Sequence, residues 1–303
     1  MNEYAPIPEA PARPVRTHRF LDRHTIAGFL LLTLWGYLVA QLVGVVASLP
    51  FSISAALSGG LDEELLNTVV GFACAVGGFL ALLIHKRWFR PEFRGCLRGA
   101  YLGEGLLMLA VPFVLIFGIT LLGPLSTEGL TLRNISLALM AGVTEEVAFR
   151  GIPGSYLMRQ WRAEKAIPRA AILTSIVFGL IHATNIFVGA DPVATLVQVI
   201  YAICLGILFA AVYLRTTNLL PTMLLHFLND VLAFLATGYV VNGVQVQAFS
   251  LADNLFNLGL GLVFALLGFW LIRPAKRASI LARWDERWSR EAEAAPQEDA
   301  ALA

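Results

Sequence analysis

Charged side chains are scarce in this 303-residue sequence. They make up 14% of the residues, whereas apolar side chains make up 57%, and the mean hydropathy is +0.71. Soluble globular domains typically carry about 25% charged residues. The composition therefore excludes a soluble globular chain and predicts a membrane protein that crosses the bilayer several times.

Other features are rare or missing as well. The three cysteines, Cys74, Cys96 and Cys204, form no CxxC pair, which excludes a disulfide framework and a thiolate metal site. The first 24 residues lack the apolar core of a cleavable signal peptide. No internal repeat indicates two inverted halves, the arrangement of many transporters. No nucleic-acid motif is present, so we expect no nucleic acid partner.

Long apolar runs, by contrast, are abundant. Eight stretches are long enough for a bilayer core, which needs about 20 apolar residues per helix. They are residues 25–49, 64–85, 102–123, 134–158, 169–188, 193–213, 217–237 and 248–272. Lys and Arg concentrate before the first stretch, after the last, and in alternate connections between them. By the positive-inside rule, the sequence predicts an all-α bundle of eight spans with both termini cytoplasmic.

The ends of the chain differ from this central part. We expect residues 1–24 to be a disordered basic tail and residues 25–273 to form the eight-helix membrane domain, with its catalytic core at 140–235. In residues 274–303, Ile280, Leu281, Trp284 and Trp288 recur at helical spacing, which predicts a helix on the membrane surface followed by a disordered end. A solvated helix is an equal alternative.

A few ionisable residues interrupt the apolar stretches, where charge is costly and usually functional. The stretch AGVTEEVAFRG holds three of them. The full set is Glu145, Glu146, Arg150, His182, His226 and Asp230. Counted along each helix at 1.5 Å per residue, three of the predicted spans place Glu145, His182 and His226 in one layer.

Spacing suggests how these groups pair. Residues four apart share a helix face, so Glu146 can pair with Arg150 and His226 with Asp230. Glu145 is then free to face His182 and His226. These three side chains could bind a divalent metal such as zinc. Alternatively, Glu145 could act without metal as a general base while the imidazoles stabilise the developing charge.

The order of these residues resembles the three motifs of the CPBP intramembrane proteases, which include the CAAX prenyl endopeptidases. The motifs EExxxR, FxxxH and HxxxB, where B is Asn or Asp, match Glu145-Glu146-x-x-x-Arg150, Phe178-x-x-x-His182 and His226-x-x-x-Asp230. The resemblance implies that Glu145 and His182 activate water, that His226 and Asp230 stabilise the oxyanion or bind metal, and that Arg150 supports the first glutamate. Members are usually described as metalloproteases, although a metal-free mechanism has also been argued.

One position departs from the commoner form of the motif. Asp230 stands where Asn is usual, and an ionised carboxylate cannot donate a hydrogen bond, which favours a metal-ligand or His-orienting role. Asn229 precedes it and should point about 100° away on an α-helix, because such a helix has 3.6 residues per turn. It is therefore not an obvious substitute.

Two other classes of function stay open from sequence alone. Carboxylates and histidines within spans also build proton-coupled transporters, and a non-catalytic membrane scaffold or immunity protein would need no such chemistry. For an endopeptidase, the expected partners are a peptide or membrane-protein substrate and the lipid bilayer. The tails favour a bacterial cytoplasmic membrane as the location.

Overall fold

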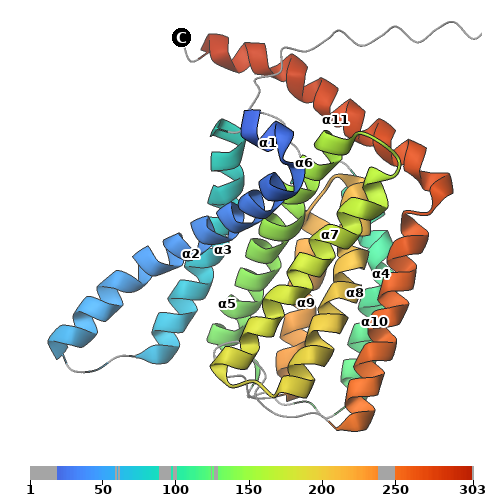
Figure 1. The fold of residues 1–303 in the computed structure, drawn as a ribbon. Helices are drawn as coiled ribbons and strands as arrows, with labels where there is room; N and C mark the ends of the chain where they lie inside the picture. Colours follow the sequence, from blue (N-terminus) through green and yellow to red (C-terminus); the bar gives the residue numbers. More distant parts are fainter. Residues whose placement is uncertain are drawn as a thin grey trace, which may run out of the picture.

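The computed structural model of the protein describes residues 19–58, 60, 62–88, 97, 101–123, 125, 129–237 and 250–301. Every regular element within these residues is a helix (Figure 1), which confirms the predicted all-α fold. The elements run in the following order: α1 (Arg19–Arg23), α2 (Thr25–Ser58), α3 (Glu63–Trp88), α4 (Leu102–Leu122), α5 (Leu132–Met140), η3 (Ala141–Gly151), α6 (Ile152–Trp161), α7 (Ala166–Ile181), η4 (His182–Val188), α8 (Pro192–Thr216), α9 (Leu220–Thr237), α10 (Leu251–Leu271) and α11 (Pro274–Ala301).

Each of the eight apolar stretches coincides with helix in the structure. By length and hydropathy, six of the described helices could cross a membrane: α2, α3, α4, α7 continued by η4, α8 and α10. Helix α9 is apolar but shorter. The remaining stretch is the continuous rod α5–η3–α6, in which the helix type changes twice. The protein is therefore an integral membrane protein, and the count of eight spans stays a prediction.

Local sequence explains where several helices begin. Thr131 accepts a hydrogen bond from the backbone N–H of Asn134 at the start of α5. Asp191 does the same for Ala194 at the start of α8, where Pro192 occupies the first turn. Ser250 and Asp253 form a reciprocal capping box on α10. Such caps satisfy backbone donors that have no partner inside the helix.

Helix α8 lies at the centre of the bundle, packed against α7 on one side and α10 on the other. Helices α2 and α3 form a long hairpin that diverges from the other helices at its far end (Figure 1). At 1.5 Å per residue, a 34-residue helix such as α2 is about 50 Å long, more than a bilayer core of about 30 Å requires. In Figure 1 it is inclined relative to α7, α8 and α10.

The two ends of the chain depart in part from the predicted tails. Residues 1–18 lie outside the described residues, and Arg19–Arg23 form α1 instead of continuing a disordered tail. Helix α11 extends to Ala301, where a disordered end was expected. Its apolar side packs on the bundle, because Ile280, Trp284 and Trp288 are buried in the main hydrophobic core.

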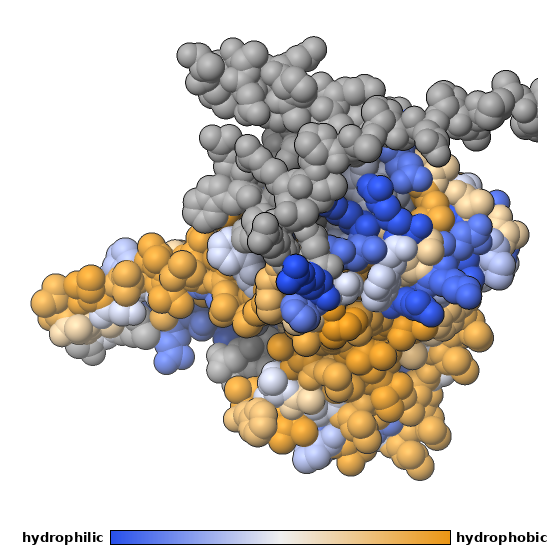
Figure 2. Space-filling view, turned by 45° about the horizontal axis from the view of Figure 1, so that its top comes forward, coloured by the Kyte–Doolittle hydropathy of each residue, from blue (hydrophilic) through white to orange (hydrophobic). Residues whose placement is uncertain are grey.

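The surface is divided by hydropathy. Hydrophobic residues cover the flank of the bundle visible in Figure 2 and much of the projecting α2–α3 hairpin, while hydrophilic residues gather toward the end that carries α11. Exposed leucine, isoleucine and valine side chains are numerous on α2, α4 and α10. This distribution is typical of helices that face lipid.

Candidate functional site

The stretch AGVTEEVAFRG forms the π-helix η3 between α5 and α6. The backbone N–H of Ile152 donates to the carbonyl of Val147, five residues back. An α-helix was expected here, so the facing directions predicted for Glu145 and Glu146 were derived from the wrong helix geometry. π-helices are rare and occur frequently at functional sites.

A glycine at the start of η3 brings this helix against α9. A Cβ atom at Gly142 would lie 2.9 Å from the carbonyl oxygen of Met223 and 3.0 Å from the backbone nitrogen of Phe227. Any larger residue would therefore push the two backbones apart. Since Glu146 lies four residues after Gly142 and His226 belongs to α9, this close approach places their side chains together.

Glu146 connects an arginine and a histidine. Its Oε1 accepts a hydrogen bond from Arg150 Nη1 at 3.0 Å, and the same oxygen lies 3.0 Å from His226 Nδ1. Glu146 is fully buried, and the side chains of Arg150 and His226 are 1% and 6% exposed. Because a carboxylate paired with arginine accepts hydrogen bonds, we assign the hydrogen of the imidazole to Nδ1. The predicted Glu146–Arg150 contact is confirmed, and the link to His226 extends it.

The second nitrogen of His226 faces two further carboxylates. Nε2 lies 3.6 Å from Glu145 Oε2 and 3.8 Å from Asp230 Oδ2. Glu145 and Asp230 are more accessible than Glu146, with side chains 22% and 25% exposed. Glu145 Oε2 is itself buried and has no hydrogen-bond donor among the described residues. Negative charge on three sides therefore stabilises positive charge that develops on the His226 ring.

Phe178 contacts both His226 of this cluster and His182. Its ring meets the His226 ring edge-on at a centroid distance of 5.8 Å and the His182 ring at 5.0 Å. His182 Nδ1 lies 3.0 Å from the Phe178 carbonyl oxygen, one turn back on its own helix. Among the described residues, no hydrogen bond or ion pair joins His182 to Glu145. The expectation that Glu145 faces both histidines therefore agrees with the contacts of His226 only.

The guanidinium of Arg150, which binds Glu146, also packs against the ring of Phe178. Its guanidinium carbon lies 3.9 Å from the centre of the Phe178 ring, a cation–π contact. A Cβ at Gly206 would lie 2.8 Å from Arg150 Nη2, so this glycine makes room for the guanidinium. Phe178, predicted as a wall of the pocket, thus contacts Arg150 and both imidazoles.

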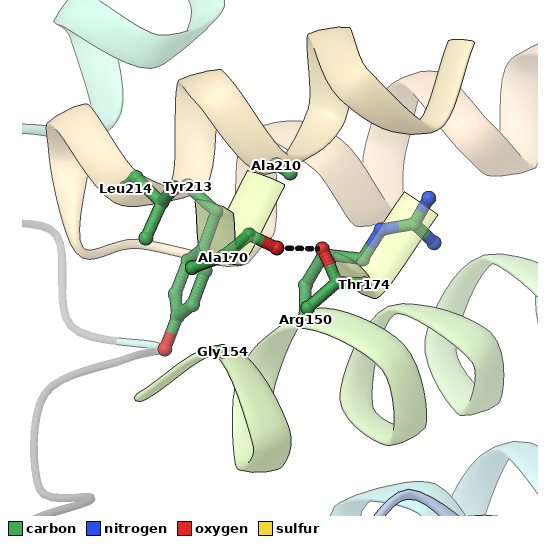
Figure 3. Close-up of a pocket in the computed structure, with 7 residues that line it drawn as sticks. All are labelled: Arg150, Gly154, Ala170, Thr174, Ala210, Tyr213 and Leu214. Carbon is green, nitrogen blue, oxygen red and sulfur yellow. Dashed lines mark hydrogen bonds between the residues drawn. The ribbon is translucent and has the colours of Figure 1, made fainter. Parts of the chain in front are cut away.

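A narrow cavity borders the stem of Arg150 (Figure 3). Its other lining residues are Gly154, Ala170, Thr174, Ala210, Tyr213 and Leu214. The guanidinium points away from these residues in Figure 3, and the cavity has no room for a water molecule. A substrate must therefore reach the carboxylates and imidazoles from another direction.

The arrangement does not match a zinc site. Zinc requires several ligands at about 2.0–2.3 Å from one point, and the described residues contain no group of three or more His, Cys, Asp or Glu that could hold a metal ion. His226 Nδ1 is directed at Glu146 and His182 Nδ1 at its own helix backbone. The predicted ligand set of Glu145, His182 and His226 is therefore not assembled around one point.

One residue of interest was set aside on sequence grounds. Asn229 Nδ2 donates a hydrogen bond to Asp230 Oδ1 at 3.1 Å, although neighbouring residues of a helix point in different directions. In the sequence, this hydrogen bond is indicated only by the adjacency of two short polar side chains, Asn229 and Asp230. Gly142 and Gly206 were not singled out either, since a close approach between helices distant in sequence leaves no local pattern.

Comparison with known families agrees with this geometry. Residues 127–232 match the family model Rce1-like, described as Type II CAAX prenyl endopeptidase Rce1-like. The chain carries an Rce1-like domain. No match to a curated protein or to a solved structure accompanies it.

The Rce1-like domain covers η3, His182 and the part of α9 that holds His226 and Asp230. Rce1-like proteins are a CAAX-type protease family, so the match confirms the resemblance found in the sequence and is consistent with an endopeptidase. Helices outside the domain also support it: Thr144 of η3 donates to the Cys74 carbonyl of α3 at 3.2 Å.

Proposed function

We propose that this protein hydrolyses a peptide bond at the carboxylate–imidazole cluster, with Glu145 as the general base. The observation that carries this proposal is the position of His226. Its Nδ1 is held by Glu146, and its Nε2 faces Glu145 and Asp230. Nδ1 thus fixes the imidazole, and Nε2 is directed at the partly accessible carboxylate of Glu145. This geometry is suited to water activation and oxyanion stabilisation.

In this mechanism Glu145 takes a proton from the attacking water while the water oxygen bonds to the scissile carbonyl carbon. The carbonyl oxygen becomes an oxyanion, which accepts a hydrogen bond from Nε2–H of protonated His226. The C–N bond then breaks, and the proton on Glu145 passes to the leaving amine. Glu145 is regenerated as a carboxylate, so the cycle balances.

The other residues of the cluster receive supporting roles. Glu146 holds the imidazole of His226 and stabilises its positive charge, and Arg150 holds the Glu146 carboxylate in place. Asp230 orients His226 from the side of Nε2. The Phe178 ring contacts the rings of both His182 and His226, and the second ring nitrogen of His182 would hold the water or the peptide.

The substrate of this proposal is a peptide or a segment of a membrane protein. Glu145 and Asp230 are the accessible members of the cluster, and the side chains around them lie inside an apolar bundle. A segment that enters laterally or from the cytoplasmic end would present its backbone there. A direct comparison of prenylated and unprenylated CAAX peptides tests whether the protein recognises a prenyl group.

The test is cleavage of fluorogenic peptides by the purified protein in liposomes. Three peptides are compared: a farnesylated CAAX peptide, its unprenylated form and a membrane-spanning segment. Removal of a general base typically costs about 10²–10⁴-fold in rate, so we expect Glu145→Gln to lose at least about 100-fold. Glu63→Gln, the same change at an exposed position of α3, should leave the rate unchanged. Equal rates for wild type and Glu145→Gln would contradict the proposal.

The same preparations address the alternatives. A proton-coupled transporter would show pH-dependent uptake into the liposomes without cleavage, and a scaffold would show neither. Metal analysis of the folded wild type beside His182→Ala and His226→Ala tests the zinc mechanism. Stoichiometric zinc in the wild type that is lost in both variants would overturn the metal-free role given to Glu145.

A further inference from the structure

The carboxylate of Asp230 depends on its neighbour Asn229. Asp230 Oδ1 accepts a hydrogen bond from Asn229 Nδ2 at 3.1 Å, and among the described residues no other hydrogen bond reaches Asp230. Its second oxygen, Oδ2, lies 3.8 Å from His226 Nε2. The two oxygens of one carboxylate thus face an amide on one side and an imidazole on the other.

This arrangement solves a geometric problem of the helix. The Asp230 side chain is 25% exposed and rotates freely about its terminal bond unless something holds it, because such torsions are broad. Residues four apart place Asp230 on the same face of α9 as His226, but that spacing alone does not direct Oδ2 at Nε2. A single amide donor on Oδ1 fixes the plane of the carboxylate.

We propose that Asn229 is a positioning residue that acts on His226 through Asp230. The inference rests on the function proposed above for His226. Asn229 donates to Asp230 Oδ1, Asp230 Oδ2 faces Nε2, and Glu146 holds Nδ1 from the opposite side of the ring. His226 is therefore oriented from both of its nitrogens, by Glu146 of η3 and by the Asn229–Asp230 pair of α9.

The proposal predicts that the effect of Asn229 exists only while residue 230 is an acid. In Asp230→Asn the one remaining side-chain oxygen can still accept from Asn229, but the other atom is then an NH₂ group, which cannot accept a hydrogen bond from Nε2–H of His226. Loss of Asn229 should then change little. A residue that acts only through packing would instead cause the same loss in both backgrounds, because independent effects add.

The experiment is a double-mutant cycle of Asn229→Ala and Asp230→Asn, measured as kcat and KM for peptide cleavage. A hydrogen bond to a charged group corresponds to roughly a tenfold change in rate. We expect Asn229→Ala to lower kcat about tenfold with KM within about twofold, and to lower it less than about twofold in the Asp230→Asn background. Val231→Ala, a change in the neighbouring residue of α9 that packs against Phe234 and Ala138, is the control and should keep the wild-type kcat. Equal losses from Asn229→Ala in both backgrounds would overturn the inference.

A second readout requires no activity. Nitrogen NMR of protein labelled with ¹⁵N-histidine at fixed pH reports the surroundings of His226 Nε2, assigned by the signal missing in His226→Gln. Asn229→Ala should shift this resonance in the wild-type background and leave it in place in Asp230→Asn. An unmoved resonance in both backgrounds would also overturn the inference. If the wild type cleaves no peptide but the shift depends on residue 230, the proposed function fails and the positioning stands.

Discussion

Glu146 is the side chain on which the structure and the chemistry of the site both depend. It is fully buried, and one of its oxygens serves Arg150 and His226 at once. Glu145, its neighbour in sequence, is partly exposed and makes no such contact with Arg150. Under the proposed mechanism, the two adjacent glutamates therefore have separable roles, Glu146 in folding and positioning and Glu145 in the reaction.

Glu146→Gln should lower both stability and activity. The substitution leaves the Arg150 charge buried without its counter-charge, and breaking a buried pair from one side costs about 3–5 kcal/mol. The thermal unfolding midpoint in detergent should therefore fall clearly, while Glu145→Gln should keep the wild-type midpoint and lose only cleavage. If both variants lose activity at an unchanged midpoint, Glu146 is not the buried support described here.

At the scale of single residues, the sequence predicted side-chain contacts within one helix but not those between different helices. Glu146–Arg150 followed from a four-residue spacing, and the contact survives the change to a π-helix. The hydrogen bond from His226 to Glu146 joins residues 80 apart and leaves no local signal. Asn229 was set aside by an argument about helix angles, which ignores that a short amide side chain can bend back to its neighbour.

The helices that hold these residues are kept close by glycines. Gly179 of α7 lies against α8, since a Cβ there would come within 2.3 Å of Ile203 Cγ1 and 2.8 Å of the Val199 carbonyl oxygen. The second atom belongs to backbone and cannot move aside alone. His182 follows Gly179 by three residues, so the spacing of α7 and α8 also sets where its ring lies.

Gly179→Ala should therefore destabilise the protein and reduce cleavage. Overpacking of this kind typically costs about 1–3 kcal/mol. Gly118→Ala in α4 is the matched control, because a Cβ at Gly118 meets nothing within 4 Å, and alanine stabilises a helix interior by up to about 1 kcal/mol relative to glycine. The comparison is made by thermal unfolding and peptide cleavage. A loss of stability in the control equal to that in Gly179→Ala would show that steric overlap is not the cause.

The lengths of the apolar runs predicted where the helices lie, but they did not predict the helix type or the residues at which each helix ends. Apolar runs located the helices of the bundle, because a membrane helix must satisfy its backbone internally whatever its side chains are, whereas the 28-residue α11 followed from amphipathic spacing. The π-helix η3 packs against α2, α3 and α9, and contacts between helices distant in sequence leave no local pattern. The α2 helix continues through Pro50 to Ser58, beyond the predicted end at residue 49.

Helix α11 ties the described C-terminal part of the chain to the rest of the molecule. Trp284 is fully buried, donates from Nε1 to the Leu214 carbonyl at 2.8 Å, and meets the Tyr213 ring edge-on at 5.7 Å. Arg283 reaches Glu104 of α4 at 2.7 Å, and Glu104 also binds Arg215. The amphipathic pattern predicted a helix on the membrane, and its apolar side in fact covers the end of the bundle.

Trp284→Ala should detach α11 and destabilise the fold. Replacing a buried Trp by Ala costs about 3–5 kcal/mol, so we expect a lower unfolding midpoint and faster cleavage by trypsin within α11. Trp284→Phe, which keeps a ring but loses the hydrogen bond, should show a smaller effect. Ser279→Ala on the exposed side of α11 is the control. An unchanged midpoint in Trp284→Ala would mean that α11 is bound elsewhere, for example to lipid.

The arrangement of the whole molecule across the membrane decides whether eight spans are correct. Helices α1 and α11 lie at one end of the bundle and η4 at the other (Figure 1). Thr184 of η4 and Ser279 of α11 are both exposed, so cysteines introduced there in a cysteine-free background can be labelled. With the basic residues cytoplasmic, a membrane-impermeant maleimide added to intact cells should label the cysteine of Thr184→Cys. It should reach that of Ser279→Cys only after the membrane is permeabilised. Labelling of both from outside would place α11 on the outer side and reject the odd number of crossings, three, that is predicted between Thr184 and Ser279. The reverse pattern would keep that number and invert the orientation.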